Sequence, residues 1–245
     1  PEVCKEVLKT MLKDLKGRLL TNIGVGSSAR YNSADASLWF FWALQEYVEF
    51  TGTAEKTWLY FKKEINHILD KYKEGTLYNI HMKSSGLLYG GQKDVALTWM
   101  DAVVDGVPVT PRGGYAVELN ALWYNAICFS LEMAKAAGDN KFIANWKNVP
   151  SSLKIAFKKM FWDEKKGYLA DACEEKIKDW SFRPNQVFAT ALKYSVCDLE
   201  MSRSILKKVK DKLLTPKGLR TLCEEDEKFI GIYNGNQKNR DHSYH

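Results

Sequence analysis

The residues best suited to chemistry flank a loop that is rich in glycine and proline. Trp99 and Asp101 precede this loop, whereas Glu118, Asn120 and Trp123 follow it at the start of an expected helix. An aromatic ring can stack on the C–H face of a sugar, amides and carboxylates can hydrogen-bond its hydroxyls, and one carboxylic acid can protonate the bond to be broken. This combination predicts a sugar pocket that carries an acid.

Asp101 is the candidate acid. Apolar surroundings beside Trp99 would raise the pKa of its carboxyl group, and a raised pKa keeps a general acid protonated near neutral pH. The alternative is that Asp101 caps a local turn or helix. The residue types alone leave both interpretations open.

Other polar residues could bind a sugar or could only stabilise the fold. Asp35 lies in the first turn of an expected helix, where a carboxylate either complements the helix dipole or accepts paired hydrogen bonds from a diol. Glu118 is favoured near its helix start on dipole grounds, whatever its function. Arg112 is either a structural anchor or a ligand clamp. Arg183 and Gln186 belong to a polar cluster around a proline that opens a helix.

The eight tryptophans fall into two expected groups. Those among helical apolar positions are predicted to be core residues: Trp42, Trp58, Trp146 and Trp162. Those next to polar clusters are predicted to line a pocket: Trp39, Trp99, Trp123 and Trp180.

Composition argues against several classes of protein. No stretch approaches 18 consecutive apolar residues, so no membrane span is expected, and the N-terminal residues lack the layout of a secretory signal. The net charge of +6 comes mostly from scattered lysines rather than from a dense basic stripe, which argues against a nucleic-acid partner.

The cysteines and histidines indicate the cellular compartment of the protein and the cofactors that it could hold. The five cysteines are odd in number and widely spaced, which favours reduced thiols in a cytoplasmic protein. The four histidines show no metal-ligand spacing, and no Gly-x-Gly-x-x-Gly or Walker loop occurs. We therefore expect neither a metal ion nor an organic cofactor.

Helical periodicity must position these residues. It predicts helices over 2–16, 33–50, 54–73, from just after Gly114 to Gly138, and roughly over 140–161, 184–196 and 199–214. The long connections 74–114 and 162–182 are expected to carry function. A loose repeat follows several helices where the chain turns back: Gly86-Leu87-Leu88, Gly167-Tyr168-Leu169 and Gly218-Leu219-Arg220. With no βαβ alternation, we predict an all-α fold of stacked helical hairpins.

Several motifs, taken in order, resemble the amylo-α-1,6-glucosidase domain of glycogen debranching enzymes. They include Thr98-Trp99-Met100-Asp101 and Arg183-Pro184-Asn185-Gln186, together with segments 31–40, 109–112, 116–125 and 244–245. The resemblance implies an (α/α)6 toroid, made of six helical hairpins, that hydrolyses α-1,6-linked glucose at branch points of glycogen or limit dextrin with inversion. In that mechanism one carboxylic acid protonates the leaving oxygen while a second carboxylate activates water.

The resemblance also assigns roles to residues. Asp101 matches the general acid. The residues assigned to substrate binding are Asp35, Trp39, Trp99, Arg112, Glu118, Asn120, Trp123, Arg183, Gln186 and His245.

Two departures from the family pattern shape the domain prediction. An aromatic segment containing Gly-Arg-Asp is not seen before Tyr31, and the chain stops at His245 without the usual Gln-Gly continuation. We therefore expect residues 1–245 to form an incomplete toroid that lacks helices at both ends, with the general base outside the chain. Alone, the fragment is predicted to be inactive, or active only when the rest is supplied. The alternatives are another toroid α-glucosidase, such as a trehalase-like or glucoamylase-like enzyme, and a non-catalytic carbohydrate-binding module.

Overall fold

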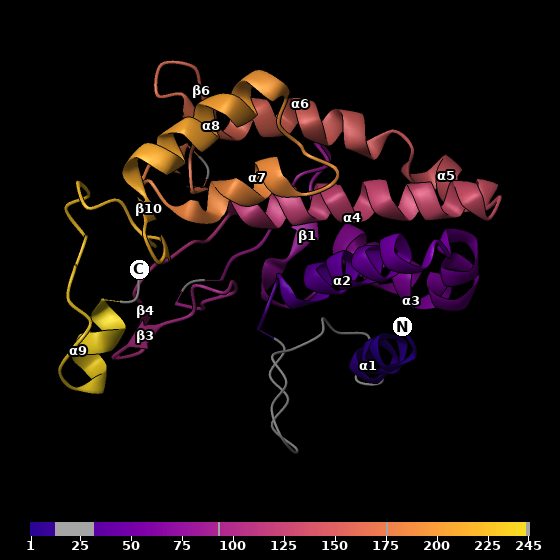
Figure 1. The fold of residues 1–245 in the computed structure, drawn as a ribbon, viewed down its shortest axis with the longest axis horizontal. Helices are drawn as coiled ribbons and strands as arrows, with labels where there is room; N and C mark the ends of the chain where they lie inside the picture. The colour runs from indigo at the N-terminus through magenta and orange to yellow at the C-terminus, as the bar shows by residue number, and fades with distance from the viewer. Residues whose placement is uncertain (13–31, 93, 175, 244–245) are drawn as a thin grey trace.

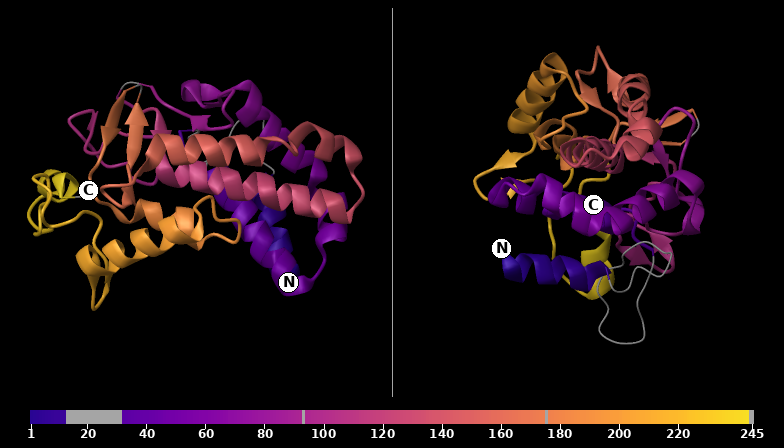
Figure 2. Two further views of the ribbon diagram at one scale, coloured as in Figure 1. Left: turned by 90° about the horizontal axis from the view of Figure 1, so that it is seen from above. Right: turned by 90° about the vertical axis from the view of Figure 1, so that its right-hand side faces the viewer.

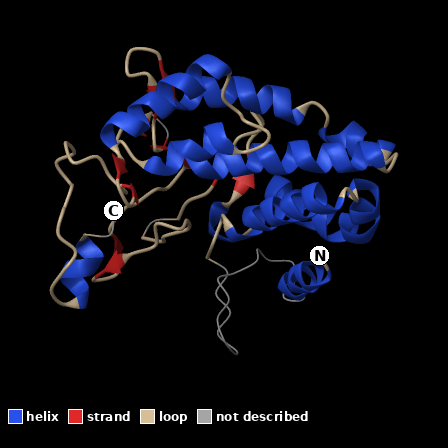
Figure 3. Ribbon diagram, viewed as in Figure 1, coloured by secondary structure: helices blue, strands red, loops and turns tan. Residues whose placement is uncertain are grey.

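Helices make up most of the computed structural model, which describes residues 1–12, 32–92, 94–174 and 176–243. Strands are short and join into small antiparallel sheets (Figure 3). The prediction of a helical fold is confirmed. Short strand pairs accompany the helices, most of them within the long connections, and the toroid stays a prediction. None of the described helices is both long enough and apolar enough to cross a membrane.

Helix α4 (Val117–Ala136) runs through the middle of the molecule (Figures 1 and 2). Helices α2 (Ala36–Thr51) and α3 (Ala54–Glu74) cover one side of it, and α5 (Asn140–Trp146) and α6 (Val149–Phe161) cover another. Most of its 20 residues are buried, as expected for a helix that is apolar nearly all round.

Aromatic side chains join these helices in the core. The Trp123 ring stacks on Tyr72 of α3 at 5.5 Å between centroids and meets Trp146 of α5 edge-on at 5.9 Å. Trp123 is 0% exposed and its indole N–H donates to the carbonyl of Gly86 at 3.0 Å. This corrects its predicted place in a pocket, because the adjacent polar residues did not reveal that the ring faces the core. Trp42, predicted to be core, is 40% exposed instead.

The observed helix boundaries agree with the periodicity at α2, α3, α4 and α8 (Leu199–Lys212) and differ over 140–161 and 184–196. The expected helix over 2–16 is helical from residue 2 to residue 12, and its last four residues lie outside the described part of the chain. The expected helix over 140–161 is divided into α5 and α6, because Pro150 lies in the first turn of a new helix. The expected helix over 184–196 is a 3-10 turn, η2 (Pro184–Val187), and the short α7 (Phe188–Ala191). The chain then turns away so that the Tyr194 amide donates to Asn125 Oδ1 at 3.2 Å. Helix α1 (Glu2–Leu12) and the unpredicted α9 (Gln237–His242) lie toward the two ends.

The glycine repeat marks a β-hairpin that follows three of the helices. Each glycine has a positive φ and lies just before the second strand or at its first residue: Gly86 at 88°, Gly167 at 64° and Gly218 at 141°. The three hairpins are β1 (His81–Met82) with β2 (Leu88–Tyr89) after α3, β6 (Trp162–Asp163) with β7 (Tyr168–Leu169) after α6, and β10 (Leu214–Thr215) with β11 (Gly218–Leu219) after α8. The prediction that the chain turns back at each repeat is confirmed.

Two further sheets lie within the long connections. Strands β3 (Val103–Val104) and β4 (Val107–Pro108) form a hairpin just after Asp101. Strands β5 (Tyr115–Ala116), β8 (Ala172–Glu174) and β9 (Ile177–Asp179) form an antiparallel sheet in the order β5-β8-β9. This second sheet brings the start of α4 against the segment 171–179, which creates the setting of the candidate site.

Candidate active site

The β5-β8 pair places two carboxylates next to each other. Ala116 pairs with Ala172 across the sheet, and the Val117 amide donates to the carbonyl of Asp171 at 3.0 Å. Glu118 begins α4 directly after this contact. Both carboxylates are almost completely buried, and a buried charge needs a partner.

Arg112 is that partner for both. Its guanidinium group makes a bidentate ion pair with Glu118, in which Nη2 lies 2.6 Å from Oε2. Its Nε donates to Asp171 Oδ2 at 2.8 Å. The remaining donors reach Thr98 Oγ1 at 3.2 Å and the Asp171 carbonyl at 3.1 Å, so all five N–H groups are used. Of the two interpretations open for Arg112, the geometry favours the structural anchor.

Asp171 joins Arg112 to the second arginine. Its Oδ2 also accepts from Arg183 Nη1 at 3.3 Å, and its Oδ1 accepts from Asn185 Nδ2 at 2.7 Å. The sequence analysis did not single out Asp171. A lone carboxylate inside the otherwise uncharged stretch 168–173 was the available signal, because a charge in such a stretch must find partners.

Arg183 is less completely satisfied than Arg112. Its Nη1 also reaches Asp179 Oδ2 at 3.1 Å, but its buried Nε has no hydrogen-bond partner among the residues that the structure describes. Against the effect of burial, the Ser181 amide and the Arg183 charge hold the pKa of Asp179 below its usual value. A buried donor without a partner is costly, so Arg183 Nε is suited to a hydroxyl of a ligand or to water.

Asn185 connects this network to the loop of the candidate acid. The Trp99 indole N–H donates to Asn185 Oδ1 at 3.0 Å, and Asn185 Nδ2 lies 3.3 Å from Met100 Sδ. Asp101 comes next in the chain and is exposed. The burial expected around its carboxyl group is therefore not found, and its role as the acid stays a prediction.

Asp35 approaches the same loop from α2. The Ala34 amide donates to the Leu97 carbonyl at 2.7 Å, which holds the start of α2 beside Trp99. The Asp35 carboxylate is 6% exposed and accepts a hydrogen bond from the Ser33 hydroxyl. Burial raises the pKa of Asp35, and the hydrogen bonds from Ser33 and the Trp99 amide oppose this.

Burial also acts on Glu118. Removal from water raises the pKa of its carboxyl group, against the opposing effect of the Arg112 guanidinium. Burial disfavours the Arg112 charge as well, but Asp171 and Glu118 together raise the pKa of Arg112 above its usual value. Arg112 and Glu118 thus keep each other charged by direct contact at a buried site.

The remaining predicted binding residues lie elsewhere or hold the fold together. Asn120 is 0% exposed and clamps β2 to α4 by accepting from the Leu88 amide at 2.8 Å and donating to its carbonyl at 3.0 Å. Gln186 donates to the Arg183 carbonyl at 3.1 Å. Trp39 is half-buried on α2 and meets Phe188 edge-on at 5.3 Å. His245 lies outside the described residues.

The site therefore unites five of the predicted residues: Asp35, Trp99, Arg112, Glu118 and Arg183. It can offer a half-buried indole face, an unpaired buried donor on Arg183, and the exposed carboxyl group of Asp101 on the adjoining loop. Within residues 1–12, 32–92, 94–174 and 176–243, no group of three or more His, Cys, Asp or Glu side chains has the arrangement of a metal site.

Solved structures share this fold at low sequence identity. A family GH78 rhamnosidase from Bacillus sp. GL1 aligns with a TM-score of 0.58 and 21% identity over 80% of this chain and 19% of its own. A rhamnosidase from Klebsiella oxytoca aligns with a TM-score of 0.57 and 14% identity over 85% of this chain and 37% of its own.

Sequence comparison is more specific. The glycogen debranching enzyme of Saccharomyces cerevisiae is 23% identical over 94% of this chain, which spans only 20% of that enzyme's length. The profile of the family described as amylo-alpha-1,6-glucosidase matches residues 2–245. The match covers nearly every residue, so the chain belongs to the amylo-alpha-1,6-glucosidase family.

Proposed function

We propose that the chain takes part in hydrolysing α-1,6-linked glucose at the branch points of glycogen or limit dextrin, in the cytoplasm. The buried network carries the proposal, because it joins Asp35, Trp99 and Arg183, which come from three distant segments, beside the loop that bears Asp101. Family membership supports a glycoside hydrolase, and the yeast relative supports a branched glucan as the substrate.

In the proposed mechanism Asp101 protonates the glycosidic oxygen as the bond to the anomeric carbon breaks. A second carboxylate removes a proton from water, which attacks the opposite face and inverts the configuration. Trp99 offers a face for stacking and Arg183 Nε a donor for a hydroxyl. We place the general base outside the chain and the helices within a larger (α/α)6 toroid.

The Asp101→Asn variant tests this role. An amide cannot donate the proton, so we expect glucose release from limit dextrin to fall by roughly 10²–10⁴-fold in the protein at its natural length. Binding of the dextrin should change little. Asp105→Asn is the matched control, because Asp105 is an exposed carboxylate on the same loop that pairs with Lys238. Unchanged turnover in Asp101→Asn would remove Asp101 as the acid.

Substrate choice separates the proposal from its alternatives. Preferential hydrolysis of panose and isomaltose favours a debranching glucosidase, whereas preferential hydrolysis of trehalose or maltose favours a different α-glucosidase. Glycogen affinity without any hydrolysis favours a non-catalytic binding module.

A further inference from the structure

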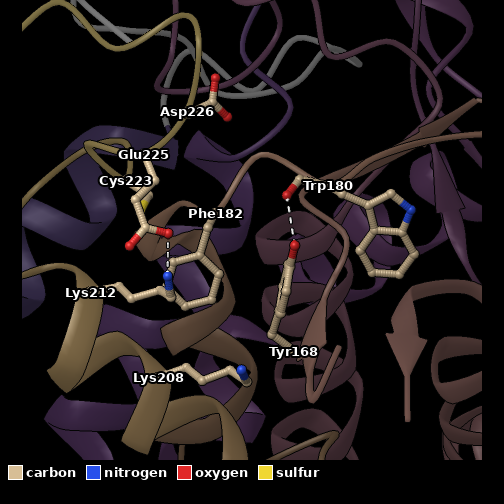
Figure 4. A pocket seen from close by; sticks show the side chains of 8 residues that line it. All are labelled: Tyr168, Trp180, Phe182, Lys208, Lys212, Cys223, Glu225 and Asp226. Atoms are coloured by element: carbon tan, nitrogen blue, oxygen red, sulfur yellow. Dashed lines mark hydrogen bonds and ion pairs between the residues drawn. The ribbon is translucent and has the colours of Figure 1, made fainter. Parts of the chain in front are cut away.

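A pocket lies on the far side of the segment that carries Arg183. It has a volume of about 240 Å³ and lies between α8, the hairpin β6-β7 and the segment 223–226 (Figure 4). Three aromatic side chains line it, namely Tyr168, Trp180 and Phe182. We call it the Tyr168 pocket; Asp101 is not among its lining residues.

Side chains alternate across the segment 179–183. Asp179 and Arg183 face the buried network and pair with each other, whereas Trp180 and Phe182 face the pocket. The Tyr168 ring meets both aromatic rings edge-on, at 5.7 Å from Trp180 and 4.8 Å from Phe182. One short segment thus forms a wall of the pocket and part of the candidate active site.

Helix α8 closes the opposite wall. Ser204 on α8 donates to the carbonyl of Gly167 at 2.8 Å, which holds the helix against the turn of the β6-β7 hairpin. Lys208 and Lys212 line the pocket from α8, and Lys212 pairs with Glu225 from the facing segment. The Ser204 hydrogen bond therefore holds in place the helix that supplies two of the lining side chains, Lys208 and Lys212.

The chemistry of the lining fits a neutral, hydroxyl-rich ligand. Two lysines and two carboxylates, Glu225 and Asp226, balance in charge, so the lining offers both donors and acceptors without a strong preference for an ion. The Tyr168 and Phe182 rings supply apolar surface for C–H faces, whereas the Trp180 ring has Lys166 Nζ at 5.2 Å and Lys178 Nζ at 5.7 Å from its centroid. The pocket volume is below the roughly 300–1,000 Å³ of pockets that enclose a drug-sized molecule. A pocket of this size suits one or two sugar units of a ligand chain whose remainder continues into solvent.

We propose that the Tyr168 pocket binds an α-glucan chain at a second site, apart from the bond that Asp101 would cleave. The inference rests on the proposed function for the identity of the glucan. Strands β3 and β4, which follow Asp101, and strand β10, which follows α8, lie at the same end of the molecule (Figure 1). One branched ligand can therefore present different chains to the two sites, and the pocket anchors the chain that is not cut.

Fluorine NMR of the protein labelled with 5-fluorotryptophan tests the proposal at single residues. Trp180 reports on the pocket and Trp99 on the candidate active site, while buried Trp58 and Trp146 serve as internal controls. Substitution of each tryptophan by phenylalanine assigns its signal. Maltoheptaose, which has no branch, is expected to shift the Trp180 signal saturably and to leave the two control signals in place.

Substitutions in the lining complete the test. Asp226→Asn keeps the oxygen that accepts from the Lys228 amide but removes the charge, and we expect it to weaken the glucan response of Trp180 about tenfold. Asp211→Asn, an exposed change on α8 away from the lining, should leave the response unchanged. Asp101→Asn should leave it unchanged as well.

Three outcomes would overturn the inference. They are a Trp180 signal that does not respond to maltoheptaose, a response that Asp226→Asn leaves as strong as in the parent, and a response to inorganic phosphate in place of glucan. Hydrolysis of panose judges the proposed function separately, so that either proposal can fail while the other stands.

Discussion

The Asp171 carboxylate holds together groups from two other segments of the chain, and its loss would leave two buried guanidinium groups short of a partner. Arg112 and Arg183 share its Oδ2, while Asn185 takes its Oδ1. Breaking a buried ion pair by removing one partner is costly because the remaining charge stays out of water.

We therefore expect Asp171→Ala to lower the free energy of unfolding by about 3–5 kcal/mol, measured by urea denaturation. Glu74→Ala, which removes a surface pair with Lys71, is the control and should have little effect. A loss for Asp171→Ala no larger than that of the control would show that the network is not a stabilising unit.

Asp35 illustrates a charge that the folded chain disfavours. Burial raises the pKa of Asp35 above its ordinary value of 3.8. Between pH 3.8 and this raised pKa, the folded state therefore binds more protons than the unfolded state. Stability from this group is present below pH 3.8 and is lost as the pH rises through the raised pKa.

The neutral amide of Asp35→Asn avoids this loss and keeps an oxygen that can accept from Ser33. We expect the variant to unfold a few degrees higher than the parent at pH 7, and the difference to vanish as the pH falls below 3.8. Thermal melts monitored by circular dichroism at both pH values check this. A variant that is less stable at pH 7 would show that the Asp35 charge itself stabilises the fold.

Single residues show what sequence patterns can and cannot reveal. The neighbours of Asp35 and Arg183 left both a structural and a binding interpretation open, and the family resemblance assigned Asp35, Trp99 and Arg183 to substrate binding. The structure brings the three residues into one network, and their contact with a substrate stays a prediction. Asp171 could not be predicted in that way, because its role depends on the pairing of β5 with β8. Trp123 and Asn120 have similar neighbours, but their orientation on α4 places them in the core.

At the scale of elements, the periodicity predicted the long helices because each has a continuous apolar face. It failed where a local feature decides the backbone, as at Pro150 and at the hydrogen bond between Tyr194 and Asn125. The strands are too short to produce an alternating pattern. The glycine repeat alone showed where the chain turns, and it could not show that the turn belongs to a hairpin.

Between strands β5 and β8, Gly114 is a position that requires glycine both for its backbone conformation and for lack of space. Its φ is +89°, and a Cβ atom there would collide with the carbonyl oxygen of Cys173 in the neighbouring strand β8. Gly138 at the end of α4 has a φ of +69° but open space around it. Substitution of Gly138 therefore tests backbone strain alone, whereas substitution of Gly114 adds a steric clash.

We expect Gly138→Ala to cost about 1 kcal/mol of stability from the left-handed backbone alone. Gly114→Ala should cost a further ~1–3 kcal/mol, because β5 must move away from β8. Because β5 leads into Glu118, Gly114→Ala should also reduce glucose release more than Gly138→Ala does. Equal losses of stability in urea denaturation would mean that the sheet accommodates the extra methyl group.

At the scale of the whole molecule, the candidate acid Asp101 lies on a loop beside the buried network, but the buried carboxylates of that network are already engaged. Glu118 and Asp171 hold Arg112, and Asp35 accepts from Ser33. A general base must be free to accept a proton from water, so these three are poorly placed to serve. Composition and motif order could predict the helical class and the family, whereas this engagement follows only from contacts between distant segments.

We therefore expect residues 1–245, produced alone, to bind a branched limit dextrin and to release no glucose from it. The protein at its natural length should bind the dextrin and release glucose, because we place the second carboxylate in its remaining part. Binding by calorimetry and glucose by a coupled oxidase assay give the two readouts, and Asp101→Asn in both forms is the control. Glucose release by the 245 residues that disappears in Asp101→Asn would show that the base lies within this chain, and Asp35, the buried carboxylate that accepts from the Trp99 amide, would then be the first candidate to test.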